Sequence, residues 1–250
     1  MAIEMKKVLI FGGASAIAHQ TAINFAKDGA ELFLIDLKVT RVNDVADDIR
    51  TRVPNSIIHT TELNALNFEL HQQTIDEVVK TLGGLDAILI AHGTLPKQED
   101  VEKDTNAIIQ EFNINALSGM SLATIAANYF EQKASGSIAI ISSVAGDRGR
   151  KSNYVYGSAK AALSAFSSGL RGRLSAKGVN VLTIKPGFVD TPMTADLPKN
   201  PLYSSPQQIG KGIFDAMKNG KNVVYLPGFW RLTMMVVKAV PEGIFKKLNF

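Results

Sequence analysis

The sequence contains no cysteine, which excludes disulfide bonds, a thiolate nucleophile and cysteine-ligated zinc. A reducing compartment fits this composition. Histidines are few as well, and none of them follows the HxH or HxxxH spacing of paired metal ligands. We therefore predict no metal site and expect these side chains to lie at the surface or to pack. They are His19, His59, His71 and His92.

The chain also lacks a run of charges of one sign and a long hydrophobic run. Its 27 lysines and arginines are interleaved with 23 aspartates and glutamates, giving a formal net charge of +4. No basic arm indicates a nucleic-acid partner. The apolar run near the N-terminus is too short for a signal peptide or a membrane span. We therefore expect a cytoplasmic protein.

Hydrophobic residues make up 46% of the 250 residues and charged residues 20%, so the chain is long and apolar enough to bury a full-sized core. No linker, internal repeat or low-complexity tract divides it. Residues 1–250 are expected to form a single domain, with residues 223–250 as an apolar and basic C-terminal extension.

Seven short apolar runs rich in valine, isoleucine and leucine alternate with stretches of helical periodicity. Continuous apolar runs indicate strands buried on both faces. Their alternation with helices predicts an α/β Rossmann-type fold, a doubly wound parallel sheet of about seven strands in a three-layer αβα arrangement. Ligands of such folds bind at the carboxyl ends of the strands. The runs are Val8–Phe11, Leu32–Ile35, Ile57–Thr60, Ala87–Ile90, Ser137–Ser142, Val179–Ile184 and Val223–Leu226.

A tight turn follows the first run, with the sequence Gly12-Gly13-Ala14-Ser15-Ala16-Ile17-Ala18. A glycine turn that opens a helix offers unpaired N–H groups and a positive dipole end to a pyrophosphate. Alanines stand where a GxxxGxG pattern has its second and third glycines, so a plain tight turn is the alternative.

The second run ends at Asp36, 24 residues after Gly12. A carboxylate there can accept hydrogen bonds from the adenosine ribose hydroxyls and would repel a 2′-phosphate. This favours NAD(H), while NADP(H) stays possible because Lys38 and Arg41 are close by. The alternative for Asp36 is a helix cap or a solvated aspartate.

A tyrosine and a lysine four residues apart, Tyr156 and Lys160, follow the fifth run. Residues at this spacing share one helix face, so we predict that the ammonium lowers the pKa of the phenol below its usual value of about 10. Ser143 ends the fifth strand and is placed to polarise the same substrate oxygen. Tyr154 has Ser158 rather than a lysine four residues on, and is expected to line the pocket or pack.

With these motifs, the sequence resembles the short-chain dehydrogenase/reductase family over its whole length. The resemblance implies an NAD(P)-dependent reductase or alcohol dehydrogenase in which Tyr156 passes the proton, Ser143 holds the carbonyl, Lys160 binds the nicotinamide ribose and Asn115 anchors a water relay. It also implies a homodimer or homotetramer built on helices that contain Asn115–Phe130 and Tyr156–Ser175. The implied cofactor contacts are Gly12, Ser15, Ala16, Ile17, Asp36, Gly93, Tyr156, Lys160, Pro186, Gly187, Val189 and Thr191.

Two motifs depart from the family pattern. The usual TGxxxGIG reads Phe11 to Ala18 here, and the usual NNAG reads Ile90-Ala91-His92-Gly93. Each added methyl group crowds the backbone where the cofactor must approach. A catalytically weak dinucleotide-sensing module is therefore the main alternative to an enzyme.

A basic connector, residues 147–153, lies between Ser143 and Tyr156. Guanidinium groups bind phosphate through planar, bidentate donors. Arg148 and Arg150 are therefore candidate substrate contacts, with Tyr154 beside them. The alternative is ordinary solvated loop charge.

The extension at 223–250 carries Trp230 and several apolar residues, with four basic residues against one acidic residue. Its apolar and basic character fits peripheral membrane contact through residues 226–250, and packing on the fold or on a partner subunit is the alternative. Within the family, this tail and the basic loop are similar to those of reductases that act on a keto sugar carried by a polyprenyl phosphate. A peripheral-membrane adaptor is the remaining alternative function.

Overall fold

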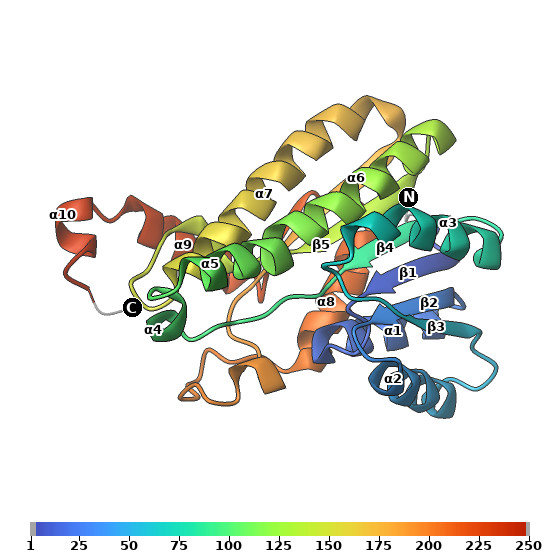
Figure 1. The fold of residues 1–250 in the computed structure, drawn as a ribbon, viewed down its shortest axis with the longest axis horizontal. Coiled ribbons are helices and arrows are strands. Elements are labelled where there is room, and N and C mark those ends of the chain that lie inside the picture. The colour runs from blue at the N-terminus through green and yellow to red at the C-terminus, as the bar shows by residue number, and fades with distance from the viewer. Residues whose placement is uncertain (1–3, 249–250) are drawn as a thin grey trace.

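Seven strands form one parallel sheet in the computed structural model, which describes residues 4–248. The spatial order is β3-β2-β1-β4-β5-β6-β7 (Figure 1). In the centre, Ile10 pairs with Leu34 on one side and with Leu89 on the other. This confirms the predicted fold class. The strands are β1 (Lys7–Phe11), β2 (Glu31–Asp36), β3 (Ile58–Glu62), β4 (Ala87–Ile90), β5 (Gly136–Ile141), β6 (Val179–Pro186) and β7 (Val223–Leu226).

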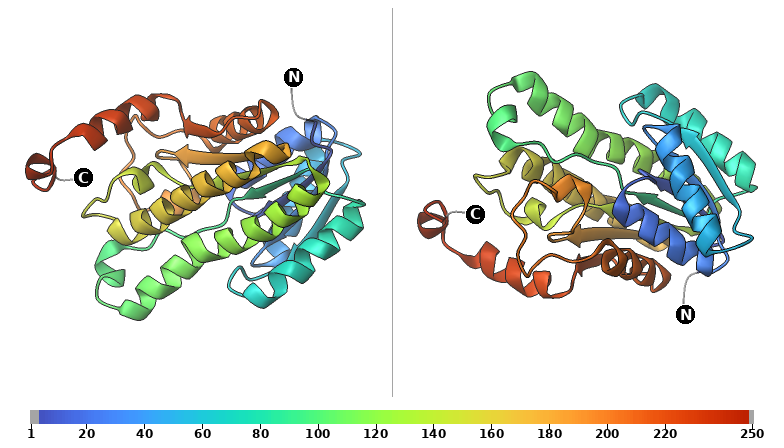
Figure 2. Two further views of the ribbon diagram at one scale, coloured as in Figure 1. Left: turned by 90° about the horizontal axis from the view of Figure 1, so that it is seen from above. Right: turned by 90° about the horizontal axis from the view of Figure 1, so that it is seen from below.

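Helices cover both faces of this sheet (Figures 1 and 2). α1, α2 and α8 pack on one face, whereas α3, α6 and α7 pack on the other. Their bounds are α1 (Ala16–Lys27), α2 (Val39–Arg52), α3 (His71–Leu82), α4 (Gln98–Val101), α5 (Thr105–Phe112), α6 (Ser118–Lys133), α7 (Tyr154–Leu174), α8 (Pro206–Lys218), α9 (Phe229–Ala239) and α10 (Glu242–Phe245).

The central strands bury both of their faces, because successive side chains point to opposite sides of the sheet. In β1, Val8 and Ile10 join the core under α1 and α8, while Leu9 and Phe11 join the core under α3 and α6. All four side chains are buried. Double burial explains why the strand sequences are continuous apolar runs.

The chain builds β1, β2 and β3 outward in one direction and then returns to place β4 on the other side of β1. The connection after β1 therefore leads toward β2, whereas the connection after β4 leads in the opposite direction toward β5. This divergence opens a crevice at the carboxyl ends of β1 and β4. Gly12, immediately after β1, has a left-handed φ of +81°, and a Cβ on it would lie 2.5 Å from the backbone nitrogen of His92. Only glycine satisfies both conditions.

α5 and α6 follow one another directly, joined by a π-helical turn at Asn113–Leu117. Such a turn uses one residue more than an α-helical turn and is frequent at functional sites. It contains the buried Asn115.

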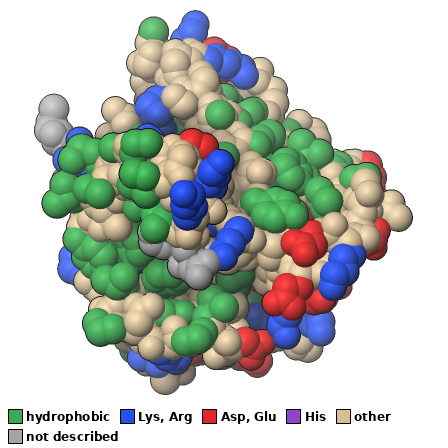
Figure 3. Space-filling view, turned by 90° about the vertical axis from the view of Figure 1, so that its left-hand side faces the viewer, with side chains coloured by type: hydrophobic (Ala, Val, Ile, Leu, Met, Phe, Trp, Pro, Cys, Tyr) green, Lys and Arg blue, Asp and Glu red, His purple; other side chains and the backbone are tan. Residues whose placement is uncertain are grey.

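The C-terminal extension forms β7, α9 and α10, and it reaches beyond the body of the molecule (Figures 1 and 2). Trp230 and Met234 of α9 are buried together with Val144. The other side of α9 is exposed, and Figure 3 shows apolar and basic side chains gathered on this end of the molecule. Within residues 4–248, no helix has the length and apolar character needed to cross a membrane.

Candidate active site

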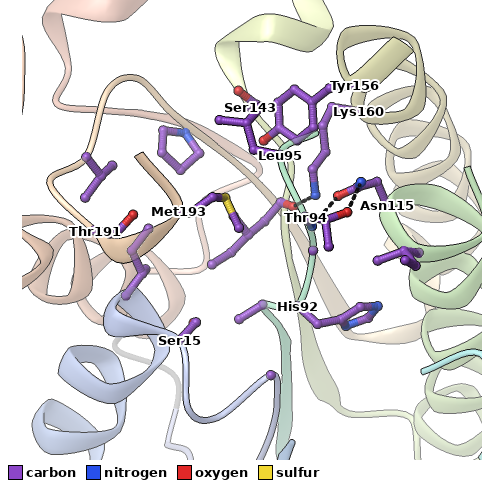
Figure 4. A pocket seen from close by; sticks show the side chains of 18 of the residues that line it. Ser15, His92, Thr94, Leu95, Asn115, Ser143, Tyr156, Lys160, Thr191 and Met193 are labelled. Atoms are coloured by element: carbon purple, nitrogen blue, oxygen red, sulfur yellow. Dashed lines mark hydrogen bonds between the residues drawn. The ribbon is translucent and has the colours of Figure 1, made fainter. Parts of the chain in front are cut away.

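A cavity of about 640 Å³ opens at the carboxyl ends of β1, β2, β4, β5 and β6. All of the residues predicted as catalytic or as cofactor contacts line it, although they come from seven separate stretches of the chain. Figure 4 shows several of them from close by. The predicted residues that line the cavity are Gly12, Ser15, Ala16, Ile17, Asp36, Gly93, Asn115, Ser143, Tyr156, Lys160, Pro186, Gly187, Val189 and Thr191.

One end of the cavity is formed by the N-terminus of α1. Ser15 caps this helix, and its hydroxyl accepts a hydrogen bond from the Ala18 N–H at 3.2 Å. The buried Asp36 carboxylate accepts hydrogen bonds from Ala14 N–H and Leu37 N–H, both at 2.9 Å. A helix N-terminus and a carboxylate at the next strand end fit the pyrophosphate and ribose of a dinucleotide.

The two alanines that replace glycines of the family pattern lie in different surroundings. Ala18 is fully buried in the core beneath α1, whereas Ala16 lies in the cavity wall. The cavity extends past Ala16 to Asp36 and Arg41. The residues present therefore still leave space and donors for a dinucleotide.

The other end of the cavity holds Ser143, Tyr156 and Lys160 (Figure 4). Ser143 follows β5, and its side chain accepts a hydrogen bond from the Ala145 N–H at 3.1 Å. Tyr156 and Lys160 share the first turns of α7, and the Lys160 Nζ atom lies 5.8 Å from the centre of the Tyr156 ring. Lys160 Nζ also donates to the Ile141 carbonyl oxygen at 3.2 Å.

The predicted decrease in the pKa of Tyr156 is wrong for this structure. Burial raises the pKa of Tyr156 to about 12, against a smaller opposing effect of its hydrogen bond with Ser143. Burial likewise lowers the pKa of Lys160 to about 8. Desolvation disfavours the charged form of each group, and the ammonium lies over the ring face. Tyr156 is therefore a fully protonated donor at neutral pH.

Asn115 is held by two neighbours from the same side of the cavity. Its Nδ2 atom donates to Thr94 Oγ1 at 2.9 Å and to Glu111 Oε2 at 2.8 Å, while its Oδ1 atom accepts from the Thr94 N–H at 3.1 Å. Thr94 Oγ1 also donates to Glu111 Oε2 at 2.7 Å. These bonds fix the orientation of the amide group.

Gly93 brings Asn115 and Lys160 together. A Cβ on Gly93 would lie 2.7 Å from Asn115 Oδ1 and 3.3 Å from Lys160 Nζ. The absence of a side chain at Gly93 therefore lets the amide and the ammonium face the same small space, which a water molecule could bridge.

His92 lies in the cavity wall where the family pattern has alanine. Ser118 donates to the Ile114 carbonyl at 2.8 Å, so its hydroxyl oxygen accepts from His92 Nε2 at 2.7 Å. Burial and the nearby Lys160 ammonium lower the pKa of His92 to about 3. Its ring packs edge-on against Phe11 at 5.0 Å. His92 is a neutral packing residue.

Two of the three predicted substrate contacts lie outside the cavity wall. The Arg148 guanidinium donates to the carbonyl oxygens of Val237 and Val240, both at 2.6 Å, and pairs with Glu242 at 2.9 Å. It therefore anchors the tail. The Tyr154 hydroxyl points to Glu102 at 3.3 Å. Arg150, in contrast, lines the cavity.

Sequence reasoning missed several residues of the cavity, among them Thr94, Leu95 and Met193 (Figure 4). It also missed Glu111, which supports Asn115 from one helical turn before it. The spacing of four residues between Glu111 and Asn115 was the available signal. Met193 sits on a single 3-10 turn, Pro192–Thr194, whose position relative to the cavity no local pattern indicates.

The sheet order defines a Rossmann-type fold, and a serine, a tyrosine and a lysine lie together at the carboxyl edge of its sheet. The family model for short chain dehydrogenases matches residues 6–202. The chain belongs to the short-chain dehydrogenase family and is an oxidoreductase of that family.

Curated relatives and solved structures agree with this assignment. An uncharacterized oxidoreductase of Mycobacterium tuberculosis is 32% identical over 241 residues, covering 96% of each chain. An uncharacterized oxidoreductase of Streptomyces coelicolor is 30% identical over 247 residues, covering 97% of this chain and 96% of its own. The crystal structure of levodione reductase superposes with a TM-score of 0.79 at 20% identity, covering 90% of this chain and 97% of that one, which shows the fold.

The buried ammonium of Lys160 makes stability depend on pH in a defined way. Between its folded pKa of about 8 and the usual 10.5, the unfolded chain binds more protons at this position than the folded chain does. The free energy of unfolding should therefore rise with pH in this window, by roughly 3 kcal/mol in total from Lys160. Lys160→Met should lose that rise.

Denaturant titrations of both proteins between about pH 7 and pH 10 measure this difference. The upper limit avoids the titration of Tyr156, whose raised pKa acts in the opposite direction above pH 10. Parallel stability curves for the two proteins would show that Lys160 is not desolvated in the folded state.

Proposed function

We propose that the protein is an NAD(P)-dependent carbonyl reductase, with NAD(H) as the preferred cofactor. The observation that carries this proposal is the position of the Tyr156 hydroxyl, buried beside Ser143 in the cavity that also contains the α1 N-terminus and Asp36. Family membership supports it. A bound dihydronicotinamide would supply a hydride to the carbonyl carbon.

Side chains of the cavity bind the carbonyl group and transfer the proton. Ser143 and Tyr156 donate hydrogen bonds to the carbonyl oxygen, and the Tyr156 Oη proton moves to that oxygen as the alcohol forms. The ammonium of Lys160 would hold the nicotinamide ribose of a bound cofactor, and its charge would stabilise the phenolate of Tyr156 that results. Asn115, fixed by Thr94 and Glu111, supports the path by which the proton of Tyr156 is replaced.

Replacing Tyr156 with phenylalanine should lower turnover by roughly 10² to 10⁴, the usual contribution of one positioned acid. NADH binding should stay nearly unchanged, because only the hydroxyl is removed. Steady-state kinetics on a panel of carbonyl compounds, including a keto sugar on a polyprenyl phosphate, measures the effect.

Tyr154→Phe is the matched control, since its hydroxyl is directed to Glu102 and lies outside the cavity wall. It should retain the rate of the unmodified protein. Full activity of the Tyr156→Phe variant would assign the proton to another donor. Tight NADH binding with no reduction of any compound would favour the dinucleotide-sensing alternative.

Asp36 should make NADH bind more tightly than NADPH, because a 2′-phosphate would meet the buried carboxylate. Asp36→Asn keeps one acceptor oxygen for the neighbouring N–H groups and removes the charge. We expect it to shift the ratio of the two dissociation constants toward NADPH by about tenfold.

Fluorescence titration of NADH and NADPH measures both constants. Arg41, which also lines this end of the cavity, provides the control: Arg41→Gln should weaken NADPH alone if the guanidinium receives the phosphate. Tighter binding of NADPH than NADH by the unmodified protein would contradict the preference for NAD(H).

We also propose that the exposed face of α9 contacts an anionic membrane. Leu232 and Met235 are each 62% exposed and Val236 is 58% exposed, on a helix whose opposite side is already packed on the fold. The tail also carries four basic residues, of which Arg231 and Lys238 lie on α9 itself and Lys246 and Lys247 follow α10. An apolar face with basic borders is typical of helices that lie on anionic bilayers.

Flotation with phosphatidylcholine vesicles, with and without phosphatidylglycerol, tests this contact. We expect binding only to the anionic vesicles, and loss of it in a Leu232→Ser and Met235→Ser double variant. Ile57→Ser, which removes an equally exposed residue from a distant loop, should have no effect. Unchanged flotation together with a decrease in oligomer size would instead make this face an interface between copies of the chain.

A further inference from the structure

Arg150 occupies an unusual place among the basic residues near the cavity. It lies on the connector between Ser143 and α7, is half-buried, and lines the cavity together with Ser143 and Tyr156. Its guanidinium therefore faces the end of the cavity where the carbonyl chemistry is proposed to occur.

Neighbouring basic residues already have acidic partners. Arg148 pairs with Glu242 at 2.9 Å, and Lys185 forms a buried ion pair with Asp147. The second carboxylate oxygen of Asp147 accepts a hydrogen bond from the Tyr225 hydroxyl at 2.6 Å. Both carboxylate oxygens of Asp147 thus already have partners, and Asp147 forms no salt bridge with Arg150, although its charge still acts on the guanidinium.

Arg150 itself has much weaker contacts. Its Nη2 atom donates to the thioether sulfur of Met234 at 3.4 Å, and its Nε atom is buried with no hydrogen-bond partner. Within the described part of the chain, no carboxylate forms a salt bridge with it. Burial lowers the pKa of Arg150, yet a guanidinium stays charged at any physiological pH. A half-buried guanidinium with no carboxylate partner is suited to bind an anion as its counter-ion.

The same wall has other unsatisfied polar groups. Asn153 also lines the cavity, and its Oδ1 atom is buried without a partner. Trp230 Nε1 is likewise buried without a partner and lies directly against Gly187, where a Cβ would be 1.9 Å from it. Donors and an acceptor without internal partners are thus grouped around one side of the cavity.

Few other charged residues line the cavity. Apart from Arg150, its wall carries Asp36 at the end of β2, Arg41 in the first turn of α2, and Lys160. Lys160 points to the space shared with Asn115 and Gly93. No acidic residue lines the cavity near Ser143, as far as the described residues show.

We propose that Arg150 forms an anion-binding subsite, so that the natural substrate is a carbonyl compound carrying a carboxylate or a phosphate group. The guanidinium supplies two parallel N–H donors to the oxyanion, the geometry that both groups share. This inference rests on the proposed reductase function, since it names the class of substrate for the same cavity.

The first test compares matched pairs of substrates that differ in charge. One pair is a 2-keto acid and its methyl ester, and the other is dihydroxyacetone phosphate and dihydroxyacetone. Arg150→Met should raise KM for the anionic member about tenfold to hundredfold and leave the neutral member nearly unchanged. Arg150→Lys should lie between the two. The pair that responds more strongly distinguishes a carboxylate from a phosphate.

Arg52→Gln is the matched control, because Arg52 is exposed at the end of α2 outside the cavity wall. It removes the same charge and should change neither substrate. Equal losses for the acid and the ester in Arg150→Met, or no loss for either, would overturn the inference and leave Arg150 as a support for Met234.

A second test needs no catalysis. Trp230 is the single tryptophan of the chain, and it borders the cavity at Gly187. Titration with the 2-keto acid, its ester and inorganic phosphate should change its fluorescence, with anion binding lost in Arg150→Met and partly kept in Arg150→Lys. If no carbonyl compound is reduced but the anions still bind through Arg150, the proposed function fails and the subsite stands. Equal affinity of the unmodified and Arg150→Met proteins for the anions would reject the subsite.

Discussion

The contact between the turn after β1 and the segment after β4 determines where the groups of the site lie. Gly12 has a left-handed backbone and approaches His92 so closely that no side chain fits between them. This contact holds the N-terminus of α1 on one side of the crevice and Gly93 on the other. Gly93 in turn lies against Asn115 and Lys160. One close backbone approach therefore links the two ends of the cavity.

Burial, more than charge pairing, controls the titration of the groups in this cavity. The pKa of Tyr156 is raised and those of Lys160 and His92 are lowered, each with desolvation as the largest cause. Tyr156 keeps its proton and His92 stays neutral, so the ammonium of Lys160 is the cation next to the proposed proton donor. A carbonyl oxygen placed at Tyr156 meets a neutral hydroxyl, which can donate its hydrogen bond and then its proton.

Much of the fold and most of the cavity could be predicted from the sequence because their signals are local. Strands buried on both faces must be continuous apolar runs, and the motifs that follow those runs meet at one edge by the geometry of parallel sheets. The predicted cofactor and catalytic residues accordingly line one cavity. Their roles, and the single-domain organisation, stay predictions.

What the sequence could not indicate depends on contacts between distant segments and on the degree of burial. Arg148 seemed equivalent to Arg150 in a basic loop, yet it bonds to the Val240 carbonyl, 92 residues further on. The direction of the pKa change at Tyr156 depends on how deeply the phenol is enclosed. The spacing between Tyr156 and Lys160 in the sequence does not indicate this. The Glu111 carboxylate accepts a hydrogen bond from Thr94, and the sequence does not indicate that these two residues are in contact.

The π-helical turn at Asn113–Leu117 sets the rotation of α5 relative to α6 about the axis of the helical segment that they form. A π turn contains one residue more than an α turn, and each residue of an α-helix turns the chain by about 100°. Loss of a single residue here would restore a regular helix and rotate the whole of α5 by that angle relative to α6. The face of α5 that now packs on α7 would then turn away from it, so a change of length by one residue would disturb this side of the cavity without altering any residue that lines it.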